Sequence, residues 1–181
     1  GLTARPALDL LGLRPGQTLA VTGAAGAVGG YAVQLAKAEG LTVIADASPA
    51  DEKLVTELGA DTVLPRGEGY PAAIREAAPD GVDGVIDSAL FHDRIVPAVR
   101  DGGTIATLRG HEGEAERGIT FVPVFVRDYS REQAKLDRLR RQVEEGTLTL
   151  RVARTFPADQ AAEAHRVLEA GGTRGRLVLE F

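Results

Sequence analysis

The sequence predicts an α/β fold, a doubly wound parallel sheet with helices on both faces. Two observations indicate this fold. Short apolar runs alternate with segments of helical periodicity along the 181 residues, the pattern of strand-helix-strand units with right-handed crossovers. One such run, 41–45 (LTVIA), is almost continuously apolar, as expected for a strand that is buried on both faces of a parallel sheet.

Residues 1–108 alternate regularly between the two kinds of element. The predicted strands are 19–21, 41–45, 62–64, 85–86 and 104–108. The predicted helices are 1–12, 27–39, 49–58, 70–78 and 90–99. Ser48 and Asp51 form a capping box for the third helix, with Pro49 at its first position. Pro97 predicts that the last of these helices is kinked or short.

The character of the sequence changes after residue 108. Residues 109–118 (RGHEGEAERG) are polar and glycine-rich and predict an exposed loop. The run from Ile119 to Val126 (ITFVPVFV) is the most β-prone of the chain, and Pro123 predicts an edge strand or a bulge. An apolar edge can pair with a second copy of the chain in a homodimer, or be covered by its own chain. Both interpretations stay open.

The remaining segments predict one helix and a small strand-helix-strand tail. Ser130 and Gln133 form a second capping box, which precedes a helix with an apolar stripe at Leu136, Leu139 and Val143. The tail predicts a strand at 148–152, a helix at 159–170 and a strand at 177–181. No linker or repeat interrupts the sequence, so residues 1–181 are predicted to form one domain.

Composition excludes several functional classes. The net charge of −5 provides no basic footprint for a nucleic acid, and no run of 18 apolar residues predicts a membrane span. The absence of cysteine excludes disulfides and thiolate zinc sites, and the three histidines are far apart in sequence, so no zinc is expected. A cytoplasmic setting is therefore expected, because no export signal is visible.

The stretch from Thr18 to Gly30 (TLAVTGAAGAVGG) contains the strongest functional motif. A strand, three glycines spaced G-x-x-G-x-x-G and a helix follow one another directly. Gly23 would permit the turn, Gly26 the approach of a pyrophosphate, and Gly29 the close packing of helix on strand. The start of the helix would offer unpaired amides to a phosphate. A strand-turn-helix without any ligand is the alternative interpretation.

A series of motifs resembles a known family. The segments VTGAAGAVG, VIADAS, ELGAD, GVDGVIDSA and RDGGTIATLRG, in this order, resemble the Rossmann-type nucleotide-binding domain of medium-chain dehydrogenase/reductases. The closest branch is the zinc-independent quinone oxidoreductases, whose last segment is also similar to FPADQAAEAHRVLEAGGTRGRLVLEF. The family places a GroES-like substrate domain before the segment that begins here at Gly1. The resemblance therefore implies a cofactor half, whose segment 147–181 packs partly on the missing domain or on a partner.

The resemblance also implies a set of cofactor-binding residues. The pyrophosphate would lie on the loop formed by Gly23, Ala24, Ala25, Gly26, Ala27, Val28 and Gly29. Asp46 is close to the place where an acidic residue binds the adenosine ribose, although the family alignment puts Ala47 in that position. Ser88 and Leu108, which end the fourth and fifth strands, would line the cofactor cleft.

Three polar residues favour NADPH over NADH. Ser48, Lys53 and Arg66 resemble the residues that receive the 2′-phosphate in NADP-using relatives. Each also has a purely structural interpretation: a helix cap for Ser48, a solvated helix charge for Lys53 and a loop charge for Arg66.

The implied function is hydride transfer from a nicotinamide to a quinone or an enone-like carbonyl compound. No catalytic acid or base can be named, and whether the chain is active without the substrate domain stays open. Two other classes stay open: a non-catalytic nucleotide-binding scaffold that works with a separate partner, and a methyltransferase-like enzyme with an adenosyl cofactor, for which Asp46 would be the binding residue.

Overall fold

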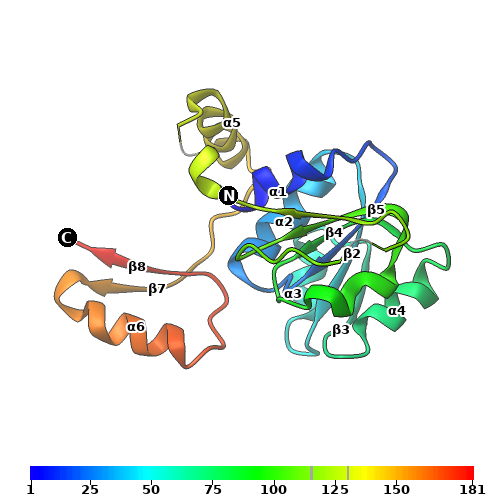
Figure 1. Cartoon of the computed structure of the whole chain (residues 1–181). Helices are drawn as coiled ribbons and strands as arrows, with labels where there is room; N and C mark the ends of the chain where they lie inside the picture. The colour runs from blue at the N-terminus through cyan, green and yellow to red at the C-terminus, as the bar shows by residue number, and fades with distance from the viewer. Residues whose placement is uncertain (115, 130) are drawn as a thin grey trace. The chain divides into compact units, whose positions relative to one another are not determined.

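The computed structural model describes residues 1–114, 116–129 and 131–181. The chain divides into two compact units, Gly1–Leu148 and Thr149–Phe181. The larger unit contains the predicted parallel sheet, and the smaller unit contains the tail (Figure 1).

Six parallel strands form the sheet of the larger unit, in the order β3-β2-β1-β4-β5-β6. The strands are β1 (Thr18–Thr22), β2 (Thr42–Ala47), β3 (Thr62–Pro65), β4 (Val82–Asp87), β5 (Val99–Thr107) and β6 (Thr120–Pro123). The strand order reverses between β1 and β4, which pair directly. This arrangement confirms the predicted doubly wound fold.

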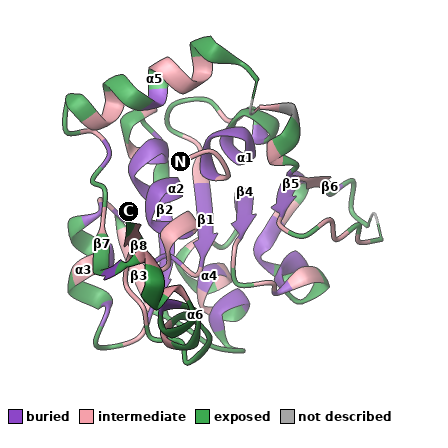
Figure 2. Cartoon of the chain, turned by 90° about the vertical axis from the view of Figure 1, so that its left-hand side faces the viewer, coloured by how far each residue is buried: buried purple, intermediate pink, exposed green. Residues whose placement is uncertain are grey.

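Helices cover both faces of this sheet, because side chains of each strand alternate between two apolar cores. The helices of the larger unit are α1 (Ala4–Leu11), α2 (Ala27–Ala38), α3 (Glu52–Glu57), α4 (Tyr70–Ala77) and α5 (Gln133–Glu144), with 3₁₀ segments η1 (His92–Ala98) and η2 (Val126–Asp128). Leu19 and Val21 of β1 belong to the core beneath α1 and α2, whereas Ala20 belongs to the core beneath α4 and η1. Figure 2 shows how continuously buried residues run through β1, β4 and α2.

Two of the predicted helices differ from the structure. The helix after β2 begins at Glu52, and Ser48 does not cap it, because the Ser48 hydroxyl donates to the Asp51 carboxylate at 2.6 Å. The predicted helix at 90–99 is the 3₁₀ segment η1, which contains Pro97 and therefore lacks the amide needed to continue an α-helix. The sequence Asp101-Gly102-Gly103 is typical of a turn, but it lies inside β5, at a shift in the register of this strand with β4.

The most β-prone run of the sequence supplies β6, which is shorter than predicted and lies at the edge of the sheet. It pairs with β5 alone, in parallel, from Thr120 to Pro123. The edge position agrees with the presence of Pro123. The capping box predicted before α5 lies outside the described residues, because it requires Ser130.

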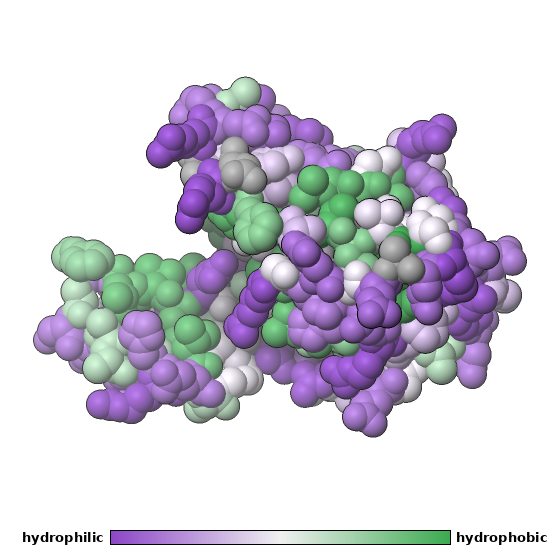
Figure 3. All heavy atoms as spheres, viewed as in Figure 1, coloured by the Kyte–Doolittle hydropathy of each residue, from purple (hydrophilic) through white to green (hydrophobic). Residues whose placement is uncertain are grey.

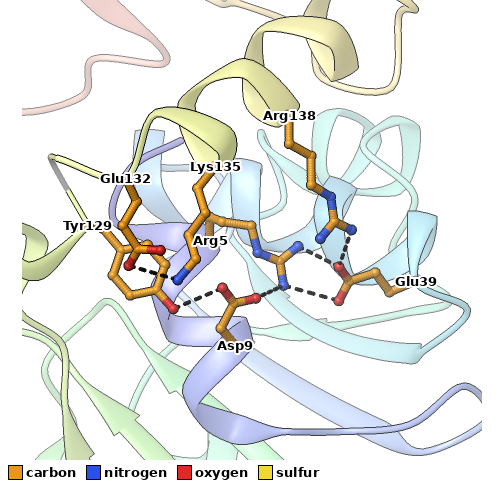
Figure 4. Close-up of polar contacts among 7 residues, drawn as sticks. All are labelled: Arg5, Asp9, Glu39, Tyr129, Glu132, Lys135 and Arg138. Atoms are coloured by element: carbon orange, nitrogen blue, oxygen red, sulfur yellow. Dashed lines mark hydrogen bonds and ion pairs between the residues drawn. The ribbon is translucent and has the colours of Figure 1, made fainter.

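A polar network fixes α5 against α1 and α2 (Figure 4). Arg5 of α1 is 3% exposed and forms ion pairs with Asp9 at 2.6 Å and with Glu39 at 2.5 Å. Arg138 of α5 reaches the same Glu39 at 3.0 Å, and Tyr129 donates a hydrogen bond to Asp9 at 2.8 Å. These contacts connect four segments that are far apart in sequence.

The smaller unit is a strand-helix-strand element of its own. Its elements are β7 (Val152–Pro157), η3 (Ala158–Gln160), α6 (Ala161–Glu169) and β8 (Arg176–Glu180). The two strands are parallel neighbours. The strand predicted at 148–152 begins instead at Val152, because Leu148 is buried in the core of the larger unit. Apolar side chains, including Val152, Val178 and Phe181, remain exposed on this unit. Figure 3 shows a green apolar area on the surface of the smaller unit.

Candidate functional site

The carboxyl ends of β1 and β4 mark the place where ligands bind in a doubly wound sheet. The chain runs from β1 toward one edge of the sheet and from β4 toward the other, so the loops after these two strands diverge. In doubly wound sheets, ligands bind at the point where such loops separate. The glycine-rich loop, residues 23–29, follows β1 and lies at this point.

Steric contacts explain the glycines of this loop. Gly23 has φ of +65°, a conformation that side chains with a Cβ rarely adopt. A Cβ on Gly29 would overlap the carbonyl oxygen of Gly23, and one on Gly26 would lie 3.0 Å from that oxygen. The Gly26 amide donates to the Gly23 carbonyl at 2.9 Å and closes the turn. The loop's own backbone therefore leaves no room for a side chain at Gly29 and little at Gly26, which explains why glycines occupy these positions.

The start of α2 follows the glycine-rich loop at the carboxyl end of β1. Ala27 and Val28 are the first residues of this 12-residue helix, and the first bond of the helix joins the Gly30 amide to the Gly26 carbonyl at 3.0 Å. The geometry of a helix gives the amides of its first turn no acceptor within the helix. Together with the helix dipole, they favour an anion at this position.

Asp46, a candidate ribose-binding residue, is turned toward the loop. Its side chain is 4% exposed, and its Oδ1 accepts the amide of Ala24 at 2.9 Å. Burial raises the pKa of Asp46, although the amides of Ala24 and Gly23 and the charge of Arg66 act in the opposite direction. The side chain of the next residue, Ala47, has no group that could accept a hydrogen bond from a ribose.

A cavity of about 190 Å³ lies at the carboxyl ends of β2 and β3. Its lining consists of Ala47, Ser48, Pro49, Glu52, Val63, Leu64 and Pro65. Of the three residues predicted to receive a 2′-phosphate, Ser48 lines this cavity. Arg66 follows directly after Pro65, is exposed, and donates its amide to the Ala47 carbonyl at 2.9 Å. Lys53 is 88% exposed and lies 3.7 Å from Glu57 on its own helix.

The loop after β4 lies against the end of β1. The Ser88 hydroxyl donates to the Thr22 carbonyl, so it fixes this loop against β1. Asp87 is 1% exposed and accepts the Thr22 hydroxyl at 2.8 Å and the His92 amide at 2.8 Å. Leu108, predicted to line the same cleft, is partly buried at the end of β5.

Two of these groups were not predicted from the sequence. Glu52 lies within the helix predicted at 49–58 and was given no role there, yet it lines the cavity at the ends of β2 and β3. Asp87 was interpreted only as the end of a strand, yet its carboxylate organises the loop after β4. Glu52 and Asp87 both follow predicted strands, at the carboxyl edge of the sheet where ligands bind, and this position could have identified them from the sequence.

Within residues 1–114, 116–129 and 131–181, no three His, Asp or Glu side chains are grouped so that they could hold a metal ion. None of the helices described here combines the length and the apolar character needed to cross a bilayer.

The sequence of residues 58–179 matches the model of a family described as zinc-binding dehydrogenase. The chain belongs to this family, within the medium-chain dehydrogenase/reductases. A zinc-type alcohol dehydrogenase-like protein of Staphylococcus epidermidis is 28% identical over 209 residues, which cover 100% of this chain and 62% of the relative. Other relatives are named quinone oxidoreductase and 2-methylene-furan-3-one reductase.

Solved structures of this family have the same fold. An NAD-dependent alcohol dehydrogenase superposes with a TM-score of 0.86 at 32% identity, covering 99% of this chain and 56% of that one. Mycobacterial Rv1454c, complexed with NADPH, gives a TM-score of 0.85 at 26% identity, covering 98% of this chain and 61% of that one. The chain spans 62%, 55% and 44% of the lengths of the first three curated relatives.

Proposed function

We propose that this chain is the NADPH-binding domain of a reductase that transfers hydride to a quinone or an enone-like carbonyl compound. The observation that carries the proposal is the glycine-rich loop at the reversal of strand order, with the amides of Ala27 and Val28 opening α2. Membership of a dehydrogenase family supports it independently.

The residues of the loop fit a dinucleotide. Any Cβ at Gly29 would overlap the backbone of Gly23, and one at Gly26 would lie close to it, so the loop needs bare backbone at both positions. The helix start would hold the pyrophosphate, and the cavity beside Ala47 would hold the adenosine end. When bound, the nicotinamide supplies a hydride from its C4 carbon. The protein contributes orientation and the exclusion of water.

The end of β2 favours NADPH over NADH. NAD-binding domains use a carboxylate here to accept the ribose hydroxyls, and such a group repels a 2′-phosphate. Ala47 offers no carboxylate, and that of Asp46 is buried against Ala24. Arg66, whose amide donates to the Ala47 carbonyl, would supply the cation that binds the 2′-phosphate. The carboxylate of Glu52, which lines the cavity, would repel that phosphate.

The same proposal covers the partners. The substrate would be bound together with a GroES-like domain, and exposed apolar residues such as Val178 and Phe181 of the smaller unit support docking on it. A homodimer would form through the run from Ile119 to Val126, which contains the edge strand β6.

Calorimetric titration with NADPH and NADH tests the cofactor preference. We expect Arg66→Ala to weaken NADPH binding about tenfold, the factor for a hydrogen bond to a charged group, and to leave NADH binding within about twofold. Glu52→Gln should strengthen NADPH binding, because it removes a like charge from the cavity. Lys53→Ala is the matched control, since Lys53 lies against Glu57 rather than in the cavity.

Three outcomes would contradict the proposal. If the chain bound neither dinucleotide at millimolar concentration, the domain would not be a nicotinamide-binding domain. If Arg66→Ala weakened both dinucleotides equally, the argument for the 2′-phosphate would fail. If Lys53→Ala had the larger effect, the phosphate would lie elsewhere.

A further inference from the structure

Asp46 is a buried acid in an unusual position within the larger unit. It is the fifth of the six residues of β2, next to β1, and the loop that follows β1 passes over it. The carboxylate is shielded from solvent, with 4% of the residue exposed. An acid in such a place needs strong hydrogen-bond donors, because burial of an ionised carboxylate is costly.

The donors to this carboxylate are backbone amides of the glycine-rich loop. Ala24 donates at 2.9 Å, and the amide of Gly23 also stabilises the ionised form. The charged or titratable groups that face Asp46 are Arg66, from the loop after β3, and Tyr70, from α4. The Tyr70 hydroxyl donates instead to the carbonyls of Ile44 at 3.1 Å and Val21 at 3.3 Å.

The position of these amides determines the course of the loop. Residues 23 and 24 are held by hydrogen bonds from their amides to the Asp46 carboxylate. In this position the Gly23 carbonyl accepts the Gly26 amide at 2.9 Å. That bond closes the turn, and the turn leads directly into the amides of Ala27 and Val28. One side chain of β2 therefore fixes the backbone that the proposed function assigns to the pyrophosphate.

We propose that Asp46 is a positioning residue: its carboxylate holds the glycine-rich loop in the shape that binds a diphosphate, and it does not itself contact the cofactor. The inference rests on the proposed function, since it assigns a task within that same site. It differs from the ribose-binding role, in which the Asp46 carboxylate would accept the hydroxyls of the adenosine ribose.

The two roles predict different results for calorimetric titration of the whole chain. If Asp46 positions the loop, Asp46→Ala weakens NADPH and NADH by the same factor, about tenfold, because both contain the diphosphate. Asp46→Asn restores binding to within about threefold of the wild type, since a carboxamide oxygen accepts the same amide. If Asp46 binds the ribose, the loss is selective for NADH.

Asp83→Ala is the matched control. Asp83 accepts the amide of Thr18 at 2.8 Å, but at the start of β1 and thus at the opposite edge of the sheet. Its removal should reduce stability and leave both affinities unchanged. An effect on affinity as large as that of Asp46→Ala would show that general destabilisation explains the loss, and the inference would be wrong.

A second measurement does not depend on the ligand. The amide hydrogen of Ala24 should exchange with solvent more slowly in the wild type and in Asp46→Asn than in Asp46→Ala. In a pH titration followed by nuclear magnetic resonance, the Ala24 amide should report an ionisation with a pKa above that of an ordinary aspartate. Equal exchange in all three proteins would overturn the positioning role even if neither dinucleotide bound, an outcome that would separately refute the proposed function.

Discussion

Carboxylates that accept backbone amides recur in the larger unit, and their surroundings differ. Asp61 accepts the amide of Val43 at 2.7 Å and pairs with Lys37 at 2.8 Å. Asp83 accepts the amide of Thr18 and pairs with Arg100 at 2.7 Å. Both lie at the starts of strands. Asp46 does the same work for the glycine-rich loop at the other end of the strands, where only amides donate to it among the described residues. Asp61 and Asp83 therefore hold the strands of the sheet, whereas Asp46 holds the loop of the candidate site.

Asp83 gives a prediction for the pH dependence of stability. Burial opposes its ionisation, but the Thr18 amide, Arg100 and Gln17 outweigh burial and lower the pKa of Asp83. A pKa that is lower in the folded state stabilises the protein above the unfolded value of about 3.9, and this gain is lost as the pH falls through the folded pKa. We expect Asp83→Asn to reduce the free energy of unfolding by about 1–2 kcal/mol at neutral pH, and by progressively less below about pH 4.

Urea denaturation at several pH values measures this difference. Asp80→Asn, at an exposed loop position, is the control and should change the free energy of unfolding by less than about 0.5 kcal/mol throughout. A difference between wild type and Asp83→Asn that stayed constant down to low pH would show that the charge of Asp83 does not contribute.

The sequence predicts the residues of the site better than their orientation. Gly23 and Gly29 stand out because no other residue type fits their conformation or contacts. The orientation of Asp46 could not be read, since the last five residues of β2 are all buried and the period-2 pattern has no polar face. Ser48 matched a capping box, in which its hydroxyl would accept a helix amide. In the structure the hydroxyl donates instead to the Asp51 carboxylate, at 2.6 Å.

At the scale of elements, the contact of α5 with α1 and α2 depends on ions rather than on a large apolar face. Leu139 is buried against the core, but the helix has four arginine or lysine residues on its surface. Arg5 supplies the buried centre of this contact, with Asp9 and Glu39 on either side of its guanidinium (Figure 4). Removing this buried guanidinium is costly, because Asp9 and Glu39 both lose an ion pair, although Tyr129 still donates to Asp9 and Arg138 still reaches Glu39.

Arg5→Ala should therefore reduce the free energy of unfolding by about 2–3 kcal/mol, because Asp9 and Glu39 lose their buried cation. Arg138→Ala removes a cation that is 50% exposed from the same Glu39, and should cost less than about 1 kcal/mol. Urea denaturation of both variants measures the two values. Equal losses would mean that burial of Arg5 adds nothing to the contact.

The sequence predicts the elements with the clearest periodicity. The strands and helices up to α4 follow the apolar pattern, apart from the late start of α3. The predicted helix at 90–99 failed because Pro97 and the amides held by Asp87 favour a tighter segment. The start of β7 was misplaced because Leu148 packs into the core of the larger unit, which no local pattern reveals.

At the scale of the whole molecule, the edge strand β6 is the surface most suited to a second copy. Its outer side has no neighbouring strand among the described residues, and Phe125, just after it, is 56% exposed. The sequence could indicate this edge through Pro123. It could not decide whether another segment of the chain covers it, because that depends on where the loop after β6 goes.

If the edge forms a homodimer, Phe125→Lys should weaken self-association at least about tenfold, since an exposed apolar ring would be replaced by a charge. Sedimentation equilibrium over a range of concentrations measures the change in apparent mass. Val178→Lys, on the smaller unit, is the control and should leave self-association unchanged. A wild type that sediments as a monomer at every concentration would contradict the homodimer.

The pairing of β1 with β4 has a consequence for the order in which the chain acquires its structure. The contact between Thr18 and Asp83 spans 65 residues, and it joins the two strands at the middle of the sheet. A chain that emerges from the ribosome can form the β1-α2-β2 portion early, but β1 can pair with β4 only after β4 has been synthesised. Since pairing over long sequence separations slows folding, we expect the pairing of β1 with β4 to form late and to limit the folding rate of the newly synthesised domain.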